Sequence, residues 1–264
     1  MTGRATGALA AGALMVASCG GGGDLDAATG ATESSAAAEE RGTVTVLAAA
    51  SLTESFEQLG DRLEEAHPGL DVVFSFGPSS GLVEQVLAGA PADLLATADT
   101  RTMAAAVEGQ AVEGEPVVFA RNTLALVVPA GNPGDVHGLD DLARDELRVA
   151  LCERQVPCGA ATERLLEAAV IRAMPDTLAT DVKEATALVS LGEVDAAVVY
   201  RTDAVAKCDA VETIEVPQAS EVVNDYPVAL VRGGPNPEAA QVVVEAITGE
   251  LGQAILAEAG FLGP

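Results

Sequence analysis

Two serines in this sequence each stand where a predicted strand gives way to a predicted helix. Ser51 follows the apolar run Thr43–Ala50, and Ser79 follows the run Leu70–Phe76 after two further residues. Runs rich in valine, leucine and phenylalanine favour buried strands, whereas apolar residues three and four apart favour a helix. A helix start presents unpaired backbone N–H groups and the positive end of the helix dipole. Two hydroxyls at two such corners therefore indicate a site for a small anion.

Each corner also has a purely structural explanation. Ser51 is predicted to be the N-cap of the first helix, with Glu54 completing a capping box. An isolated corner of this kind is most often an ordinary serine cap without a ligand. Ser80, beside Ser79, is expected to be such a local cap. Repetition of the corner, with Gly77 allowing close approach to the backbone, favours the anion site.

The elements that must position these serines alternate between strand and helix. Further strands are predicted at 91–98, 148–151 and 195–200, and two long apolar runs at 116–129 and 226–231 are predicted to cross between lobes. Repeated strand–helix–strand units indicate parallel sheets with helices on both faces. Ligands of such sheets lie beyond the carboxyl ends of the strands. Both serine corners are expected at that edge.

The first 42 residues are predicted to precede the folded part. Residues 1–18 have a positive start and a short apolar run, which indicates a signal peptide. The following Cys19, after Val16-Ala17-Ser18, is typical of a lipoprotein, so we expect cleavage before Cys19 and lipidation of its thiol. A plain secretory peptide is the alternative. Residues 19–42 lack apolar periodicity and are expected to be a flexible tether.

Composition excludes some classes of function. The chain of 264 residues has 14 Lys and Arg against 40 Asp and Glu, a formal charge of −26, and no Trp. Such acidity makes nucleic acid an unsuitable partner. It does not argue against a small anion pocket, because the dipoles of such a pocket act only over a few ångströms. Neither His67 nor His137 lies in a recognisable catalytic motif that would supply a base for a serine nucleophile. An exported enzyme with Ser51 or Ser79 as nucleophile is therefore a weak alternative to a binding protein.

Three cysteines follow Cys19. Cys152 and Cys158 lack the paired spacing of zinc ligands, and a disulfide is the expected state outside the cytoplasm. We expect Cys152 to pair with Cys158 and Cys208 to be a free thiol; pairing of Cys208 with either of the others is the alternative. Arg121 is expected to form a surface or inter-lobe ion pair, as is Arg201.

The sequence resembles the periplasmic molybdate-binding proteins of molybdate ABC transporters over nearly all of Thr43–Leu262. The segments that carry the resemblance are Val46–Leu52, Ser75–Leu82, Gly89–Leu94, Val156–Gly159, Asp181–Lys183, Val199–Ala204 and Tyr226–Ala229. The resemblance implies an α/β class II periplasmic binding protein fold, with two α/β lobes joined by two crossing strands. On this basis lobe 1 comprises residues 43–121 and 226–264, and lobe 2 comprises residues 122–225.

The resemblance also implies a site, a ligand and a partner. In that family the oxyanion is held by two serine hydroxyls, a tyrosine hydroxyl and main-chain N–H groups, which correspond here to Ser51, Ser79 and Tyr200, and to the N–H groups of Cys158 and Val182. Alanine is frequent in the family where this chain has Cys158. The implied ligand is molybdate or tungstate, with sulfate as the alternative, and the partner is an ABC transporter permease. We expect a monomer without a cofactor, held at the outer face of the membrane by its lipid anchor.

Overall fold

The computed structural model describes residues 42–264. The predicted signal peptide, residues 19–41 of the predicted tether and the expected lipidation residue Cys19 lie outside the described residues. Gly42, predicted to end the tether, is instead the first residue of the first strand. In the described part of the chain, no helix combines the length and the apolar character that a membrane crossing requires.

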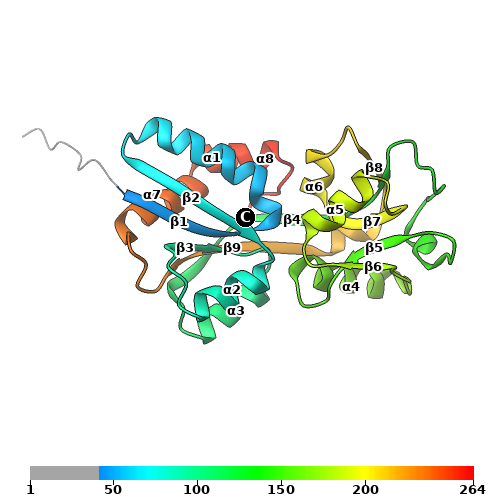
Figure 1. Cartoon of the computed structure of the whole chain (residues 1–264), viewed down its shortest axis with the longest axis horizontal. Coiled ribbons are helices and arrows are strands. Elements are labelled where there is room, and N and C mark those ends of the chain that lie inside the picture. Colours follow the sequence, from blue (N-terminus) through cyan, green and yellow to red (C-terminus); the bar gives the residue numbers. More distant parts are fainter. Residues whose placement is uncertain (1–41) are drawn as a thin grey trace, which may run out of the picture. The chain divides into compact units, whose positions relative to one another are not determined.

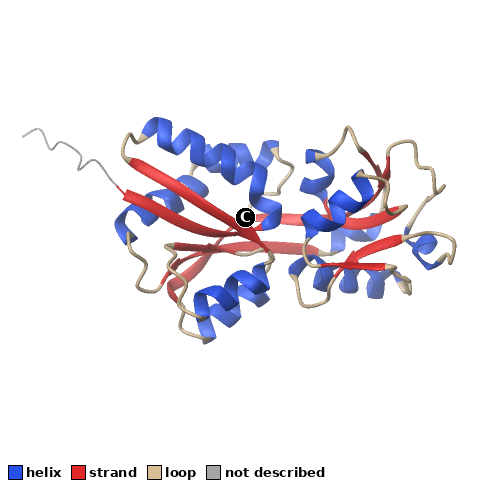
Figure 2. Ribbon diagram, in the orientation of Figure 1, coloured by secondary structure: helices blue, strands red, loops and turns tan. Residues whose placement is uncertain are grey.

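Strands and helices alternate along most of the chain (Figures 1 and 2). The strands are β1 (Gly42–Ala49), β2 (Leu70–Gly77), β3 (Leu94–Ala96), β4 (Val112–Pro129), β5 (Val149–Cys152), β6 (Thr177–Ala179), β7 (Ala196–Tyr200), β8 (Val211–Ile214) and β9 (Val223–Val231). The α-helices are α1 (Thr53–Ala66), α2 (Ser79–Leu87), α3 (Thr100–Glu108), α4 (Pro157–Ala169), α5 (Val182–Ser190), α6 (Arg201–Ala206), α7 (Pro237–Thr248) and α8 (Glu250–Glu258). Short 3-10 helices span Ala50–Leu52, Leu139–Ala143 and Pro217–Glu221.

Within residues 42–264 the strands form two sheets that share β4 (Figure 1). We call the first sheet A, with the order β2-β1-β3-β9-β4, and the second sheet B, in which β4 continues to β7, β5 and β6 while β8 also pairs with β4. Pairing is parallel for β1 with β2 and β3, and for β5 with β6 and β7, as the strand–helix repeats predict. Pairing that involves β4 or β9 is antiparallel, so the sheets are mixed rather than wholly parallel.

Helices cover both faces of sheet A (Figure 2), and its inner strand β1 is apolar on both sides. In β1, Val44 and Val46 pack in the same cluster as Phe56 of α1, whereas the intervening Leu47 packs with Leu82 of α2. Successive side chains of a strand point to opposite faces, so a continuous apolar run is what a strand between two helical layers needs. This packing holds the carboxyl ends of the strands at one edge of the sheet.

The register of β1 and β2 brings the two serine corners together. Ala49, the last residue of β1, is the partner of Gly77, the last residue of β2. Ser51 and Ser79 each follow two residues later, so neighbouring parallel strands deliver them to the same edge. The predicted convergence of these corners is therefore present in the structure.

Sheet B repeats this arrangement with different residue types. Cys152 and Ala179, the last residues of β5 and β6, are register partners. The starts of α4 and α5 follow them, and Tyr200 is the last residue of the adjacent β7. Tyr200 and the starts of both helices thus lie at one edge of sheet B.

The long strands β4 and β9 connect the two sheets. The partner of β4 changes from β9 to β7 between Thr123 and Leu124, two residues beyond the lobe limit expected after Arg121. At this crossing Asn122 and Asn224 are register partners. The two crossing strands are observed, and the lobe limits stay a prediction.

Candidate functional site

A small cavity lies between the carboxyl edges of sheets A and B. It is lined by all five residues of the predicted site, Ser51, Ser79, Cys158, Val182 and Tyr200, and by Ala49, Ala50, Gly77, Pro78, Ala98, Val156, Pro157 and Asp181. The five are almost completely buried, with exposed fractions from 1% to 5%. The cavity has a volume of about 20 Å³ measured for the centres of water-sized atoms. That size suits one small tetrahedral ion.

Ser51 lies in a 3-10 turn rather than at the start of α1. The N-cap of α1 is Leu52, and no side chain caps this helix, so the predicted capping box of Ser51 with Glu54 is wrong. The extra turn, Ala50–Leu52, places the serine before the helix and turns its side chain to the interior. The Ser51 Oγ lies 2.9 Å from the Tyr226 Oη, so this hydroxyl belongs to a buried hydrogen-bond network. It does not cap a helix.

Ser79 is the first residue of α2, and its Oγ accepts the N–H of Ala98 at 3.1 Å. Ala98 follows β3, so this bond ties the second serine corner to the third strand of sheet A. Pro78 is the N-cap of α2 and no side-chain cap bond is formed, so the cap role expected for Ser80 is wrong. Ser80 is half-buried and is not among the residues that line the cavity.

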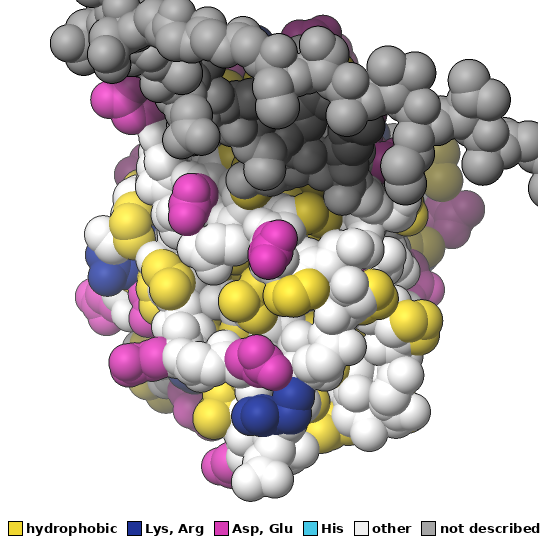
Figure 3. All heavy atoms as spheres, turned by 90° about the vertical axis from the view of Figure 1, so that its left-hand side faces the viewer, with side chains coloured by type: hydrophobic (Ala, Val, Ile, Leu, Met, Phe, Trp, Pro, Cys, Tyr) yellow, Lys and Arg dark blue, Asp and Glu magenta, His cyan; other side chains and the backbone are white. Residues whose placement is uncertain are grey.

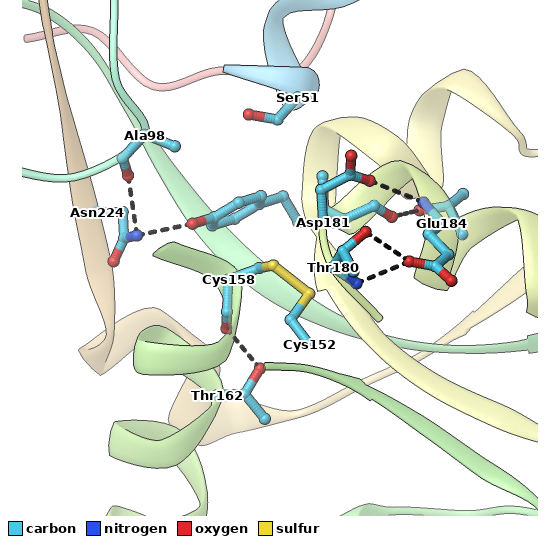
Figure 4. The surroundings of a disulfide bond; sticks show 12 residues. Ser51, Ala98, Cys152, Cys158, Thr162, Thr180, Asp181, Glu184 and Asn224 are labelled. Atoms are coloured by element: carbon cyan, nitrogen blue, oxygen red, sulfur yellow. Dashed lines mark hydrogen bonds between the residues drawn. A yellow bond between two sulfur atoms is a disulfide. The ribbon is translucent and has the colours of Figure 1, made fainter. Parts of the chain in front are cut away.

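Tyr200 brings its hydroxyl to the cavity from the end of β7. Its Oη accepts a hydrogen bond from the Nδ2 of Asn224 at 2.8 Å (Figure 4). Burial is the main cause that raises the pKa of the Tyr200 phenol well above its ordinary value. The phenol therefore keeps its proton at neutral pH and can donate it.

Two helix starts contribute main-chain N–H groups. Cys158 is the second residue of α4 and Val182 is the first residue of α5. N–H groups in the first turn of a helix have no carbonyl partner within the helix, so they are available to an anion. The Asp181 side chain caps α5 by accepting the N–H of Glu184, which leaves the N–H of Val182 to the cavity.

The disulfide of the structure joins Cys152 to Cys158, the pair expected from the sequence, and Cys208 is free and exposed. The bridge connects the end of β5 to the first turn of α4, with Cα atoms 5.8 Å apart (Figure 4). It therefore fixes the turn that presents the Cys158 N–H. The Thr162 Oγ1 donates to the Cys158 carbonyl one turn later, at 2.8 Å.

One carboxylate, that of Asp181, belongs to a residue of the cavity lining, where the sequence predicts hydroxyls and amides only. Its Oδ1 accepts the N–H of Glu184 at 2.9 Å, so the carboxylate is engaged with the helix end (Figure 4). A capping role explains why an acidic residue occurs beside a site for an anion.

An ion-pair network beside the cavity joins the two sheets. The Lys183 Nζ lies 2.6 Å from Glu54 of α1 and 2.9 Å from Asp203 of α6. Burial raises the pKa of Asp203 to about 6, although Lys183 acts against this shift. Among the described residues, neither Asp203 carboxylate oxygen accepts a hydrogen bond of good geometry, so the ammonium charge is its main compensation.

Charge elsewhere is distributed over the surface. Figure 3 shows acidic side chains spread over one face, mixed with apolar ones and few basic ones. The expected ion pair of Arg121 is present, with Asp225 at 2.8 Å. Across residues 42–264, no group of three or more His, Cys, Asp or Glu side chains is placed to hold a metal ion.

Sequence reasoning missed three buried residues behind the cavity: Asn122, Asn224 and Tyr226. The two asparagines are polar residues within otherwise apolar crossing strands, which is the signal that could have identified them. Tyr226 was recognised only as part of a matching segment. All three contact the hydroxyls of the site, directly or through one another.

Comparison with known proteins places this chain in a family. A sequence profile described as bacterial extracellular solute-binding protein matches residues 44–262. The molybdate-binding protein ModA of Mycobacterium tuberculosis is 37% identical over 221 residues, which cover 84% of this chain and 85% of that protein. This chain belongs to the ModA family of bacterial extracellular solute-binding proteins.

Solved structures support the fold of this ModA-family chain. The periplasmic molybdate-binding protein of Azotobacter vinelandii has a TM-score of 0.68 at 22% identity, over 84% of this chain and 99% of that one. The sulfate-binding protein SubI of Mycobacterium tuberculosis has a TM-score of 0.70 at 22% identity, over 83% and 86%. The predicted α/β periplasmic binding protein fold is confirmed, and at these identities the likeness speaks for the fold alone.

Proposed function

We propose that this protein captures molybdate or tungstate outside the cytoplasm and delivers it to the permease of an ABC transporter. The observation that carries the proposal is the convergence of three hydroxyls and two helix-start N–H groups on one ion-sized cavity. The proposed ligand contacts are Ser51, Ser79, Tyr200 and the main-chain N–H groups of Cys158 and Val182. Membership of the ModA family supports the same ligand.

The chemistry of the ligand matches this set of groups. Molybdate and tungstate are fully ionised at neutral pH, so every oxygen accepts hydrogen bonds and none donates. A hydrogen bond to a charged partner is worth about 1.5–3 kcal/mol net, so roughly five of them give tight binding without a neutralising cation. The dipoles of α4 and α5, which both begin at the cavity, add smaller favourable contributions.

Location and role follow from the same proposal. Lipidation of Cys19 would hold the protein at the outer face of the cytoplasmic membrane, with residues 19–42 as a tether. We assign no catalytic role, because the partners of the candidate nucleophiles are a phenol for Ser51 and a main-chain N–H for Ser79. Neither partner is a general base at neutral pH.

Sulfate is the alternative ligand. It is also a fully ionised tetrahedral dianion, and the sulfate-binding protein SubI shares the fold. The two proposals differ in the size of ion that the cavity prefers, so a direct competition between sulfate and molybdate separates them.

Titration calorimetry with molybdate, tungstate, sulfate and phosphate tests the function. We expect molybdate and tungstate to bind most tightly and to raise the melting temperature. Ser51→Ala, Ser79→Ala or Tyr200→Phe should each weaken molybdate binding ten- to a hundredfold, corresponding to about 1.5–3 kcal/mol for one lost donor to a charged ligand. Tight binding of sulfate with none of molybdate would support the alternative, and binding of none of the four ions would refute the proposed function.

A further inference from the structure

Each hydroxyl of the cavity is hydrogen-bonded on the side that faces away from the cavity. Ser79 accepts the N–H of Ala98, Tyr200 accepts from Asn224, and Ser51 pairs with Tyr226. A hydroxyl has one proton and two lone pairs, so the direction of the bond behind it decides whether its proton remains for a ligand.

The orientation of the Asn224 side-chain amide is set by two hydrogen-bond partners, one that can only donate and one that can only accept. Its Oδ1 accepts from the guanidinium of Arg164, which can only donate, and its Nδ2 donates to the carbonyl of Ala98 at 3.0 Å, which can only accept. The second proton of Nδ2 is directed at the Tyr200 Oη, 2.8 Å away (Figure 4). Tyr200 is therefore the acceptor in this bond, so its own proton is not used by Asn224.

Asn122 acts on Ser51 through one intermediate. Its Oδ1 accepts the N–H of Thr123 at 3.0 Å, so its Nδ2 is the group that donates to Thr202 at 2.9 Å and to the Tyr226 Oη at 3.3 Å. Tyr226 accepts this bond, so its own proton remains available for the Ser51 Oγ, 2.9 Å away, although either hydroxyl of that pair can donate. In the arrangement proposed below, Tyr226 donates to Ser51 and the Ser51 proton points into the cavity.

The two asparagines form a pair on the crossing strands. Asn122 of β4 and Asn224 of β9 are register partners, and their exposed fractions are 1% and 3%. Buried amides are costly unless all their hydrogen bonds are made, and each of these amides uses both its oxygen and its nitrogen. The crossing strands thus carry a fully bonded polar pair directly behind the site.

We propose that Asn122 and Asn224 are positioning residues that hold the Ser51 and Tyr200 hydroxyls as proton donors toward the cavity. This inference rests on the proposed function and deepens it. With Ser79 oriented in the same sense by the Ala98 N–H, all three hydroxyls present protons to the ligand. Such a cavity favours an oxyanion without a proton over hydrogen phosphate, whose proton would face other donors with no acceptor.

Asn224→Asp tests the inference with a side chain of the same shape. An aspartate can keep the contact with Arg164, but its second oxygen accepts from Tyr200 and so withdraws that proton from the cavity. We expect molybdate affinity to fall ten- to a hundredfold and the preference for molybdate over phosphate to shrink. In a Tyr200→Phe background the same substitution should add less than twofold, since the hydroxyl through which Asn224 acts is gone.

Asn236→Asp is a control for the change in net charge alone. Asn236 donates to Thr43 at the opposite end of β1 from Ser51, so this variant changes net charge without touching the cavity. We expect its affinity for molybdate to stay within twofold of the unsubstituted protein. Equal affinities of Asn224→Asp and Asn236→Asp, or a full additional loss by Asn224→Asp in the Tyr200→Phe background, would overturn the inference.

Tyr226→Phe provides a second variant that does not depend on the fold tolerating an aspartate. It removes the proton donated to Ser51, so we expect a several-fold loss of molybdate affinity that disappears in a Ser51→Ala background. Full additivity of Tyr226→Phe and Ser51→Ala would count against the inference. If the unsubstituted protein binds none of the four anions, the proposed function fails, whereas unchanged variants of a binding protein refute this inference alone.

Discussion

The two sides of the cavity use different parts of the chain to offer hydrogen bonds. Sheet A contributes the side chains of Ser51 and Ser79, whereas sheet B contributes the main chain of Cys158 and Val182 together with the Tyr200 hydroxyl. A side-chain donor is specified by residue type and is lost in one substitution. A main-chain donor is specified by where a helix begins, so it changes only when the local backbone moves.

This difference indicates where each side is vulnerable. On the sheet A side the residue itself matters, together with the hydrogen bond behind it. On the sheet B side, binding depends instead on the features that fix where the helices begin. These are the disulfide at α4, the glycine that follows Cys158, and the Asp181 cap of α5. Substitutions at these devices test whether the two sides depend on different physical causes.

The largest effect is expected at the link between the sides. Lys183→Met removes the ammonium that pairs with Glu54 and with the fully buried Asp203. Breaking a buried pair costs about 3–5 kcal/mol, and the lower end applies because 26% of the Lys183 side chain is exposed. Urea unfolding at pH 7.5 measures this loss. A change below ~1 kcal/mol would show that the pair is screened like a surface one.

The pH dependence of that variant has a definite sign. Burial raises the pKa of Asp203 to about 6 in the folded protein, above the value of ~3.9 usual for an unfolded chain. This group therefore contributes stability below pH ~4 that is lost as the pH rises through about 6. Without Lys183 the pKa rises further, so the destabilisation should be smaller at pH 5 than at pH 7.5. Adding Asp203→Asn to Lys183→Met should remove this difference.

The next effect concerns the glycine that follows Cys158. A Cβ on Gly159 would lie 1.9 Å from the carbonyl oxygen of Glu153, a backbone atom that cannot turn away. Gly159→Ala should cost toward the upper end of the ~1–3 kcal/mol typical of overpacking, and should weaken molybdate binding by moving the Cys158 N–H. The gain in helix propensity, about 1 kcal/mol, is too small to compensate.

Gly81 offers the matched control on the sheet A side. It lies in the first turn of α2, and the nearest atom to its added Cβ is a side-chain carbon of Pro78 at 3.5 Å. Gly81→Ala should therefore preserve binding and leave stability unchanged or slightly higher. Equal losses of stability and affinity in Gly159→Ala and Gly81→Ala would contradict the prediction that the start of α4 tolerates an added Cβ less well than the start of α2.

Loss of the disulfide is expected to have a smaller effect. Replacing Cys152 and Cys158 by alanine opens a short loop, for which chain entropy predicts a loss of about 2 kcal/mol. Molybdate affinity should fall as well, because the α4 start is less well fixed. Thermal unfolding and calorimetry measure both quantities, and Cys208→Ser, which removes the exposed free thiol, should change neither.

The smallest effect is expected at Ser80. This residue makes no cap bond and does not line the cavity, so Ser80→Ala should change stability by no more than ~0.5 kcal/mol and leave affinity intact. Its neighbour Ser79 should lose ten- to a hundredfold in affinity on the same substitution, as stated above. Loss of binding in Ser80→Ala with retention in Ser79→Ala would show that the alignment of this corner is shifted by one residue.

The sequence predicts most of what depends on local pattern. The run Thr43–Ala50 is predicted correctly as a strand, because burial on both faces leaves a continuous apolar signal. The run Leu70–Phe76 is also predicted correctly, although β2 lies at the edge of the sheet and alternates between buried and exposed residues. The strands β6 and β8 were missed because each is short and has only one fully buried residue, whereas the equally short β3 and β5 are buried throughout. The capping box failed because a 3-10 turn intervenes before α1, and the resulting contact of Ser51 is with a residue 175 positions away.

The pairing of Asn122 with Asn224 could not be derived from either segment alone. It requires the antiparallel register of β4 and β9, which no local pattern specifies. The five proposed contact residues were predicted from short matching segments and from the ends of predicted strands, which are local features of the sequence. The residues behind them were identified only in the assembled structure.

The position of β9 has a consequence for how the molecule folds. This strand lies between β3 and β4, so it completes sheet A only after residue 231 is available, more than 130 residues after β3. Until then the first strands can form no more than a three-stranded fragment, with β4 unpaired along its first half. Contacts this distant in sequence make folding slow. A newly made chain therefore cannot complete sheet A until its last quarter has been synthesised, whereas every strand of sheet B precedes β9 and is made earlier.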